Sequence, residues 1–457
     1  MDPQTYARAQ RPQFLEDLKA FLRIPSVSTL PEHAPDLRRA AAWLEERMRG
    51  MGLKARIIEN DAHPLVYGEW LGAPGRPTLL CYGHYDVQPP DPLGEWTSPP
   101  FEPTLRGEDL YARGASDDKG QVMIQLCAVE AWLRTVGRLP LNVKFFIEGE
   151  EELGSPRVTG FIPRHRGLLR ADVSLVCDGI FYAPETPALV TGLRGLVYVE
   201  VEARGASRDL HSGQYGGAAP NPLEALARII AGLRDRRGRV ALPRFYAAVQ
   251  PPSPLEREAW GRLPFAESDY LRDLGIDVAP GEEGFSILER RWARPTLEVH
   301  GIVGGFSGPG PKTVIPARGT AKLSMRLVPA QKPRAVLRAL TQKVQRLTPP
   351  GVRTEVRVLS LADPVLVSPE EPAVRAAARA LEEVFGRPPV FMREGGSVPV
   401  VAGFVNVLRA PAVLMGFGLP DDRLHAPNEK FHLPNFFRGI ETVIRFLNLV
   451  GERAPRR

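Results

Sequence analysis

Histidine and carboxylate side chains follow three apolar segments of this sequence, close to the point where each segment ends. His84 and Asp86 come after TLLCYG, Glu151 and Glu152 come shortly after VKFFIE, and Asp178 comes after VSLVC. Ligands of an open α/β sheet bind beyond the carboxyl ends of its strands. We therefore expect these side chains to line one crevice.

A glycine-flanked loop, YARGASDDKG, adds Asp117 and Asp118 at the start of a predicted helix. Imidazole and carboxylate donors without cysteine suit Zn²⁺, Mn²⁺ or Co²⁺ better than they suit a structural cysteine-type zinc site. Two ions about 3.5–4 Å apart need a bridging ligand, which a carboxylate can supply. The clustered acids therefore predict a site for cations, whose charge would relieve the repulsion between neighbouring carboxylates.

The elements that would position these residues follow from the apolar patterns. Segments 77–86, 141–148 and 171–179 have the composition of buried strands, and helical spacing indicates a helix from about Gly120 to Val136. This alternation predicts an α/β fold in which the catalytic domain has a mainly parallel sheet with helices on both faces.

A different pattern begins near residue 194. LVYVEVEA alternates apolar and polar residues, as a half-exposed antiparallel strand does, and the helices after it have one apolar face. We therefore predict an inserted α+β domain at residues 194–359, while residues 1–193 and 360–457 together form the catalytic domain. The length of 457 residues also favours two domains over a single core.

Composition narrows the class of protein. The 59 Lys and Arg residues exceed the 53 Asp and Glu residues by six, but the arginines are scattered, so we expect no nucleic-acid partner. We expect no membrane partner, because no stretch of about 18 apolar residues occurs. The N-terminal segment lacks a signal-peptide core, so we expect a cytoplasmic protein. Cys81, Cys127 and Cys177 lie in apolar runs and should be buried small hydrophobic residues.

Seven segments, in order along the chain, resemble the dipeptidase branch of the M20 metallopeptidase family. They are GHYDVQP, ARGASDDKGQ, EGEEELGSP, CDG, DLHSGQYGGAAPNP, REGGSVPV and LHAPNEKF, and the similarity extends from about Ile24 to Asn428. The resemblance implies two divalent metal ions per subunit, with zinc favoured and manganese or cobalt as alternatives. It also implies a homodimer formed through the inserted domain, which would serve as a dimerisation or lid domain.

The resemblance also implies a role for each ligand. His84 and Asp178 would hold one ion, Glu152 and His425 would hold the second, and Asp117 would bridge both. The peptide bond after the bridging aspartate is expected to be cis.

The same resemblance assigns the catalytic groups. Glu151 would be the general base on a metal-bridging water, and Asp86 would hydrogen-bond the imidazole of His84. His211 would stabilise the tetrahedral charge in the active site of the partner subunit. The residues expected to bind the substrate and its carboxylate are Arg326, Thr313, Glu394, Gly395, Gly396 and Ser397.

The remaining acids and histidines are expected to have structural roles. Glu148 and Glu150 should face solvent or support the loop, which leaves Glu151 and Glu152 for the chemistry. A shift of one residue in this assignment would exchange the roles. The histidines expected to be structural are His33, His63, His165, His300 and His432.

These assignments predict a metallopeptidase that hydrolyses dipeptides or short peptides with a free C-terminal carboxylate. An N-acyl-amino-acid amidohydrolase or a carboxypeptidase of the same family is the alternative, because both share the ligand set. Asp178 after LVC is typical of the dipeptidase and carboxypeptidase branches. An inactive peptide-binding relative is disfavoured by the presence of Glu151 and all five ligands. A structural calcium site is disfavoured by the histidines, since Ca²⁺ prefers oxygen ligands.

Overall fold

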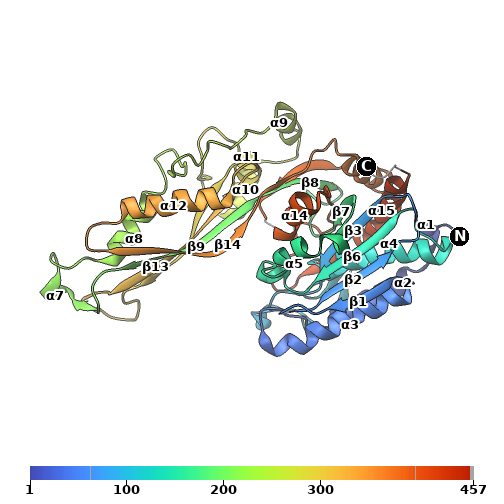
Figure 1. Ribbon diagram of the computed structural model, residues 1–457, viewed down its shortest axis with the longest axis horizontal. Helices are drawn as coiled ribbons and strands as arrows, with labels where there is room; N and C mark the ends of the chain where they lie inside the picture. Colours follow the sequence, from blue (N-terminus) through green and yellow to red (C-terminus); the bar gives the residue numbers. More distant parts are fainter. Residues whose placement is uncertain (62, 397, 453–457) are drawn as a thin grey trace. The chain divides into compact units, whose positions relative to one another are not determined.

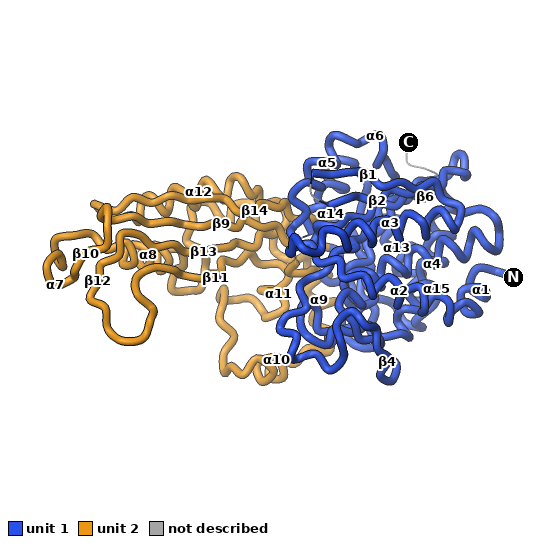
Figure 2. Tube along the Cα trace, turned by 90° about the horizontal axis from the view of Figure 1, so that it is seen from below, with its two compact units in different colours: residues 1–191, 367–392, 398–457 blue, residues 192–366, 393–397 orange. Residues whose placement is uncertain are grey.

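The chain divides into two compact units in the computed structural model, which describes residues 1–61, 63–396 and 398–452 (Figure 1). Unit 1 comprises residues 1–191, 367–392 and 398–457, and unit 2 comprises residues 192–366 and 393–397 (Figure 2). Unit 2 thus contains the predicted insertion at 194–359 and extends beyond it at both ends. It also includes the short segment 393–397, which the sequence pattern placed in the catalytic domain.

Unit 1 contains most of a nine-stranded mixed sheet, of which β15 and the last residues of β8 and β16 fall within the residue range of unit 2. In spatial order its strands are β1 (Lys54–Ile58), β2 (Leu65–Trp70), β6 (Asn142–Glu148), β3 (Thr78–His84), β7 (Val173–Val176), β17 (Ala412–Leu414), β8 (Ala188–Leu193) and β15 (Val365–Leu366), with β16 (Val390–Glu394) also paired to β8. The central strands β6, β3, β7 and β17 pair in parallel. The pairs β1–β2, β2–β6, β17–β8 and β8–β15 are antiparallel. The prediction of a mainly parallel sheet is therefore right for the centre and wrong for the flanks, where strands pair without a crossover helix.

Helices cover both faces of this sheet, as predicted. They are α1 (Pro3–Ala9), α2 (Arg11–Leu22), α3 (Ala34–Gly50), α4 (Lys119–Val136), α5 (Val158–Arg164), α6 (Arg166–Leu169), α13 (Pro372–Phe385), α14 (Pro399–Gly403) and α15 (Leu433–Gly451). Adjacent residues of β3 face opposite helical layers. The ring of Tyr82 lies 5.5 Å from that of Phe404, which follows α14 on one face. Gly83 points to the other face, where an added Cβ would meet Val122 of α4. The three cysteines are buried, as predicted.

Short elements complete unit 1. They are the 3-10 turns η1 (Pro31–His33), η2 (Leu93–Glu95) and η3 (Glu151–Leu153), the π-helical turn η4 (Phe404–Leu408), and a small sheet of β4 (Thr104–Arg106), β5 (Asp109–Tyr111) and β18 (Lys430–His432).

Unit 2 is an α+β layer. Its antiparallel sheet has the order β11 (Thr296–Gly304), β13 (Arg318–Leu327), β9 (Gly195–Arg204) and β14 (Arg353–Ala362). Val197, Val199 and Val201 of β9 are buried and the residues between them are half-buried, as the alternating pattern predicts. Helices α8 (Pro222–Ala231) and α12 (Pro333–Leu347) pack against this sheet (Figure 1). The remaining elements are β10 (Leu210–His211), α7 (Ser212–Tyr215), α9 (Pro254–Gly261), α10 (Glu267–Leu274), α11 (Ile287–Trp292) and β12 (Val314–Ile315).

Of the helices in the described part of the chain, none combines the length and the apolar character needed to cross a membrane.

Candidate active site

His84 ends the central strand β3 with its side chain fully buried. Its Nε2 atom lies 3.1 Å from Asp117 Oδ1 and 3.9 Å from Asp178 Oδ2. On the other side of the ring, Nδ1 lies 3.0 Å from the carbonyl oxygen of Asp86 and 3.4 Å from its carboxylate. Nδ1 can donate its proton to Asp86, so Nε2 can either carry a second proton that it donates to Asp117 or, once that proton is lost, bind a metal ion beside the two acids.

Asp117 is shared by two groups of candidate metal ligands. Its second oxygen, Oδ2, lies 3.0 Å from His425 Nε2, which in turn lies 3.3 Å from Glu152 Oε2. Within each group, His84–Asp117–Asp178 and Asp117–Glu152–His425, the ligand atoms all lie within 4.8 Å of one another. The structure therefore brings together all five predicted ligands, with Asp117 at the centre. The Asp117–Asp118 peptide bond is cis, as expected.

The histidines balance the charge of these carboxylates. Burial disfavours ionisation of Asp117, but hydrogen bonds from His425 and His84 outweigh it and lower the pKa of the carboxyl below its ordinary value. Hydrogen bonds to Asp117 and Glu152 raise the pKa of His425 to about 10. Burial opposes protonation of His84, yet its acidic neighbours raise its pKa well above the ordinary value. The acids therefore need positive charge nearby, which protons or metal ions can supply.

The turn η3 presents Glu151 and Glu152 as adjacent residues with different surroundings. Asp86 fixes this turn, because its two carboxylate oxygens accept hydrogen bonds from the backbone N–H groups of Glu151 and Glu152 at 3.2 and 3.1 Å. Burial raises the pKa of Glu151 well above its ordinary value, and the neighbouring carboxylates add to this effect. Asp86 therefore connects the base candidate to the ligand His84.

Gln88 is a site residue that the sequence analysis missed. Its side-chain amide donates a 2.7 Å hydrogen bond to Glu152 Oε2, the same oxygen that faces His425. The signal available in the sequence was its place in GHYDVQP, four residues after His84.

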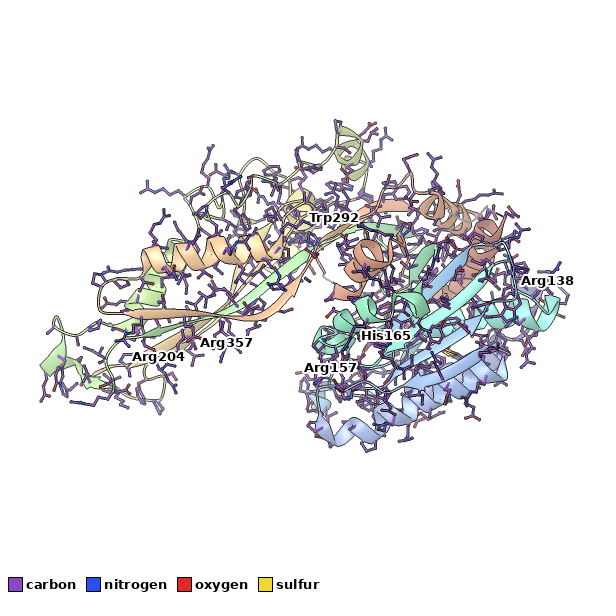
Figure 3. All side chains as sticks on the ribbon, in the orientation of Figure 1. Arg138, Arg157, His165, Arg204, Trp292 and Arg357 are labelled. Carbon is purple, nitrogen blue, oxygen red and sulfur yellow. The ribbon has the colours of Figure 1, made fainter. Side chains whose placement is uncertain are left out.

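Glu148 and Glu150 do not face solvent, so that part of the prediction is wrong. Both are fully buried. Glu148 accepts hydrogen bonds from the Tyr82 hydroxyl and Ser155 Oγ, and burial raises its pKa to about 8. Glu150 Oε1 accepts from the backbone N–H groups of Arg157, labelled in Figure 3, and Val158, at the start of α5. Both acids support the loop, as the other part of the prediction states.

The predicted residues of unit 2 form two groups. In the first, His211 is exposed at the end of β10, and the carbonyl oxygen of Thr313 accepts a 3.0 Å hydrogen bond from Ser212 N. In the second, the carbonyl oxygen of Gly396 accepts a 3.1 Å hydrogen bond from the backbone N–H of Arg194.

Arg194 was also missed by the sequence analysis. Burial, together with the charge of the nearby Arg326, lowers the pKa of Arg194 to about 10. A Cβ on Gly395 would lie 3.9 Å from its guanidinium carbon. Burial raises the pKa of Glu394, while the charge of Arg291 opposes this rise. Ser397 lies outside the described residues.

The histidines expected to be structural have local partners. Nδ1 of His33 lies 2.9 Å from Asp36, and Nδ1 of His432 lies 2.9 Å from Asp109. The ring of His165, labelled in Figure 3, stacks at 3.7 Å on that of Phe161. The other two, His63 and His300, contact Ser28 O and Ser324 Oγ.

Two histidine–carboxylate groups that share one aspartate, at the strand ends of an α/β sheet, are typical of two-metal hydrolases. Residues 80–449 match the model of peptidase family M20/M25/M40, and the chain belongs to this family. The predictions of M20 membership and of a metallopeptidase are thereby confirmed.

Three relatives illustrate the similarity. The chain is 31% identical to the Cys-Gly metallodipeptidase DUG1 of Candida albicans, over 97% of this chain and 95% of the relative. It is 29% identical to the human Beta-Ala-His dipeptidase, over 96% of this chain and 90% of the relative. Among solved structures, the M20 family metallo-carboxypeptidase Sso-CP2 from Sulfolobus solfataricus superposes with a TM-score of 0.88 at 34% identity, covering 96% of this chain and 99% of that chain.

Proposed function

We propose that this protein is a dipeptidase that hydrolyses the peptide bond of dipeptides or short peptides carrying a free C-terminal carboxylate. The observation that carries the proposal is the position of Asp117, whose two oxygens face His84 and His425 at 3.1 and 3.0 Å. The names of the Cys-Gly and Beta-Ala-His dipeptidases support a dipeptide as the substrate.

The donor set fits two divalent ions. His84 and Asp178 would hold one ion, Glu152 and His425 would hold the second, and Asp117 would contact both. Two imidazoles among carboxylates favour zinc, with manganese or cobalt as alternatives. When bound, the ions would polarise the scissile carbonyl and lower the pKa of water.

The protein's own groups would move the proton. Burial among other acids raises the pKa of Glu151, which makes its carboxylate a stronger base than an ordinary glutamate, and Glu151 would accept a proton from water and then give it to the leaving amine. Asp86 holds the backbone of Glu151 in place, and Gln88 orients Glu152. Replacing Glu151 with Gln should lower kcat by about 10²–10⁴-fold while both ions stay bound. Turnover close to that of the wild type would remove Glu151 from the mechanism.

The residues of unit 2 would recognise the substrate. Arg326, with the adjacent Arg194 and the Glu394–Ser397 segment, would bind the C-terminal carboxylate, for which an arginine fork is well suited. Thr313 would be a second carboxylate contact, and His211 would stabilise the tetrahedral charge in the partner's site.

A homodimer through unit 2 is part of this proposal. The edge strand β11 supports it, because the apolar side chains of Val299, Ile302 and Val303 are 41, 56 and 70% exposed there. The double variant Ile302→Lys, Val303→Lys should be monomeric by light scattering, bind both ions and lose activity. A fully active monomer would contradict the proposed role of His211.

A substrate panel tests the main proposal. Free dipeptides such as Cys-Gly and β-Ala-His should be cleaved faster than tripeptides with the same C-terminal residue, and faster than N-acetyl amino acids.

The 34% identity to a metallo-carboxypeptidase favours carboxypeptidase activity as the second candidate. Preferred release of the C-terminal residue from longer or N-blocked peptides would select that candidate.

A further inference from the structure

The segment 422–429, which carries His425, is joined at both ends to the loop that carries Asp117. At one end, Asp422 Oδ2 accepts hydrogen bonds from Ser116 Oγ and Leu419 N, both at 2.8 Å. Asp422 and Ser116 are both buried. This contact fixes the residue immediately before Asp117.

At the other end, Glu429 makes four hydrogen bonds to the same loop. Its Oε1 atom accepts from the backbone N–H groups of Ser116 and Asp117 at 3.0 and 3.1 Å. Its Oε2 atom accepts from Gly114 N at 3.0 Å and from Arg113 Nη1 at 2.8 Å. Glu429 is fully buried, so these bonds are shielded from water.

The backbone between these two contacts has an uncommon conformation. Arg423, His425 and Asn428 have φ values of 57, 61 and 62°. Non-glycine residues in this left-handed region keep their conformation only where the surrounding structure determines it. The Asn428 side chain adds further bonds, to Glu95 O at 2.8 Å and from Thr97 N at 2.9 Å.

We propose that Asp422 and Glu429 are positioning residues that hold His425 against Asp117 before any metal binds. This inference rests on the proposed function, since His425 and Asp117 act as ligands only there. The bonds join protein groups to one another, so they form without an ion. The ion would then meet a ligand pair that is already in place. These bonds matter because the His425 side chain is 53% exposed, so packing alone does not fix its position.

The variant Glu429→Gln tests the proposal. An amide nitrogen then faces N–H donors, so the side chain can no longer accept all four hydrogen bonds. In the metal-free protein, hydrogen exchange of peptides covering residues 419–430 should become faster than in the wild type. The affinity for the second zinc ion should fall about 10–100-fold in a competition titration.

The matched control is Glu441→Gln in α15. Glu441 is also a buried carboxylate of unit 1, and it accepts hydrogen bonds from Arg8 and Arg11. This variant should change neither the exchange of residues 419–430 nor the zinc affinity. If Glu429→Gln does not fold, Ser116→Ala removes only the Asp422 contact and should shift both readouts in the same direction by a smaller factor.

Two results would overturn the proposal. One is exchange of residues 419–430 in the metal-free wild type at the rate of an unstructured peptide. The other is wild-type zinc affinity and exchange in a folded Glu429→Gln variant. Failure of the proposed function would give a different result. The wild type would then hydrolyse no peptide, while hydrogen exchange of residues 419–430 in the metal-free protein would still be slower than in Glu429→Gln.

Discussion

His84 and His425 contact the same aspartate, but they come from two different kinds of structure. His84 ends a buried strand between two parallel neighbours, and its side chain is fully buried. His425 lies in a left-handed stretch of loop, and its side chain is 53% exposed. The first histidine is fixed by the packing of the sheet, whereas the second depends on hydrogen bonds between distant loops.

The difference indicates that the two ions should respond differently to mutation. A ligand set by core packing cannot be removed without a cost in folding free energy. A ligand on an exposed loop can be removed at a lower cost, but its geometry depends on the residues around it.

The largest effect should come from Asp117→Ala, because this variant removes the ligand that both groups share. We expect loss of both ions and of all measurable peptidase activity. Metal content after gel filtration, together with a dipeptide assay, checks this outcome. Retention of two ions would show that Asp117 is not the bridge.

A sharper test compares His84→Ala with His425→Ala in the metal-free protein. His84→Ala should lower the free energy of unfolding by about 1–3 kcal/mol, because it leaves a gap and unpaired acids in the core. His425→Ala should lower it by a smaller amount, because removal of a side chain that is 53% exposed leaves no gap in the core, although it also removes the contacts with Asp117 and Glu152. Urea denaturation of both variants measures the difference, and equal losses would contradict the comparison.

Proton release on metal binding should report on His425. Its pKa is raised to about 10 in the metal-free protein, and it must lose that proton before it can bind a metal ion. The affinity for the second ion should therefore rise as pH increases from about 6 toward that value. Calorimetry in buffers of different ionisation enthalpy measures the released protons, and the release should decrease in His425→Ala.

The smallest effect should come from Gln88→Ala, which removes the hydrogen bond to Glu152. We expect about a tenfold loss of affinity for the second ion, with the first ion retained. Metal titration distinguishes the two steps. The opposite pattern, with the first ion weakened, would place Gln88 in the other group.

The two groups also differed in how far the sequence predicted them. His84 and Asp178 follow apolar strands, so the general geometry of α/β sheets indicates that they meet. The loop contacts of Glu429 join residues more than 300 positions apart, and no local pattern reports such a contact. His425 was therefore predicted only through family resemblance, and Glu429 was not predicted.

Charge alone left two interpretations of Glu148 and Glu150 open, exposure to solvent or support of the loop. The second is right, because hydroxyl and backbone N–H groups face these buried carboxylates. A sequence shows the charge of such a residue, but it does not show which donors the fold places opposite it. The antiparallel flanks of the sheet were missed for a related reason, since strand pairing across the sheet depends on contacts outside each strand.

The 308-residue separation between Asp117 and His425 has a consequence for synthesis of the chain on the ribosome. His84, Asp117 and Asp178 are all made well before the segment 422–429, so a nascent chain could assemble one cation site long before the other. Capacity for a second cation would then arise only late in translation. A peptidase built in this order would complete its set of ligands only after most of the chain has been made.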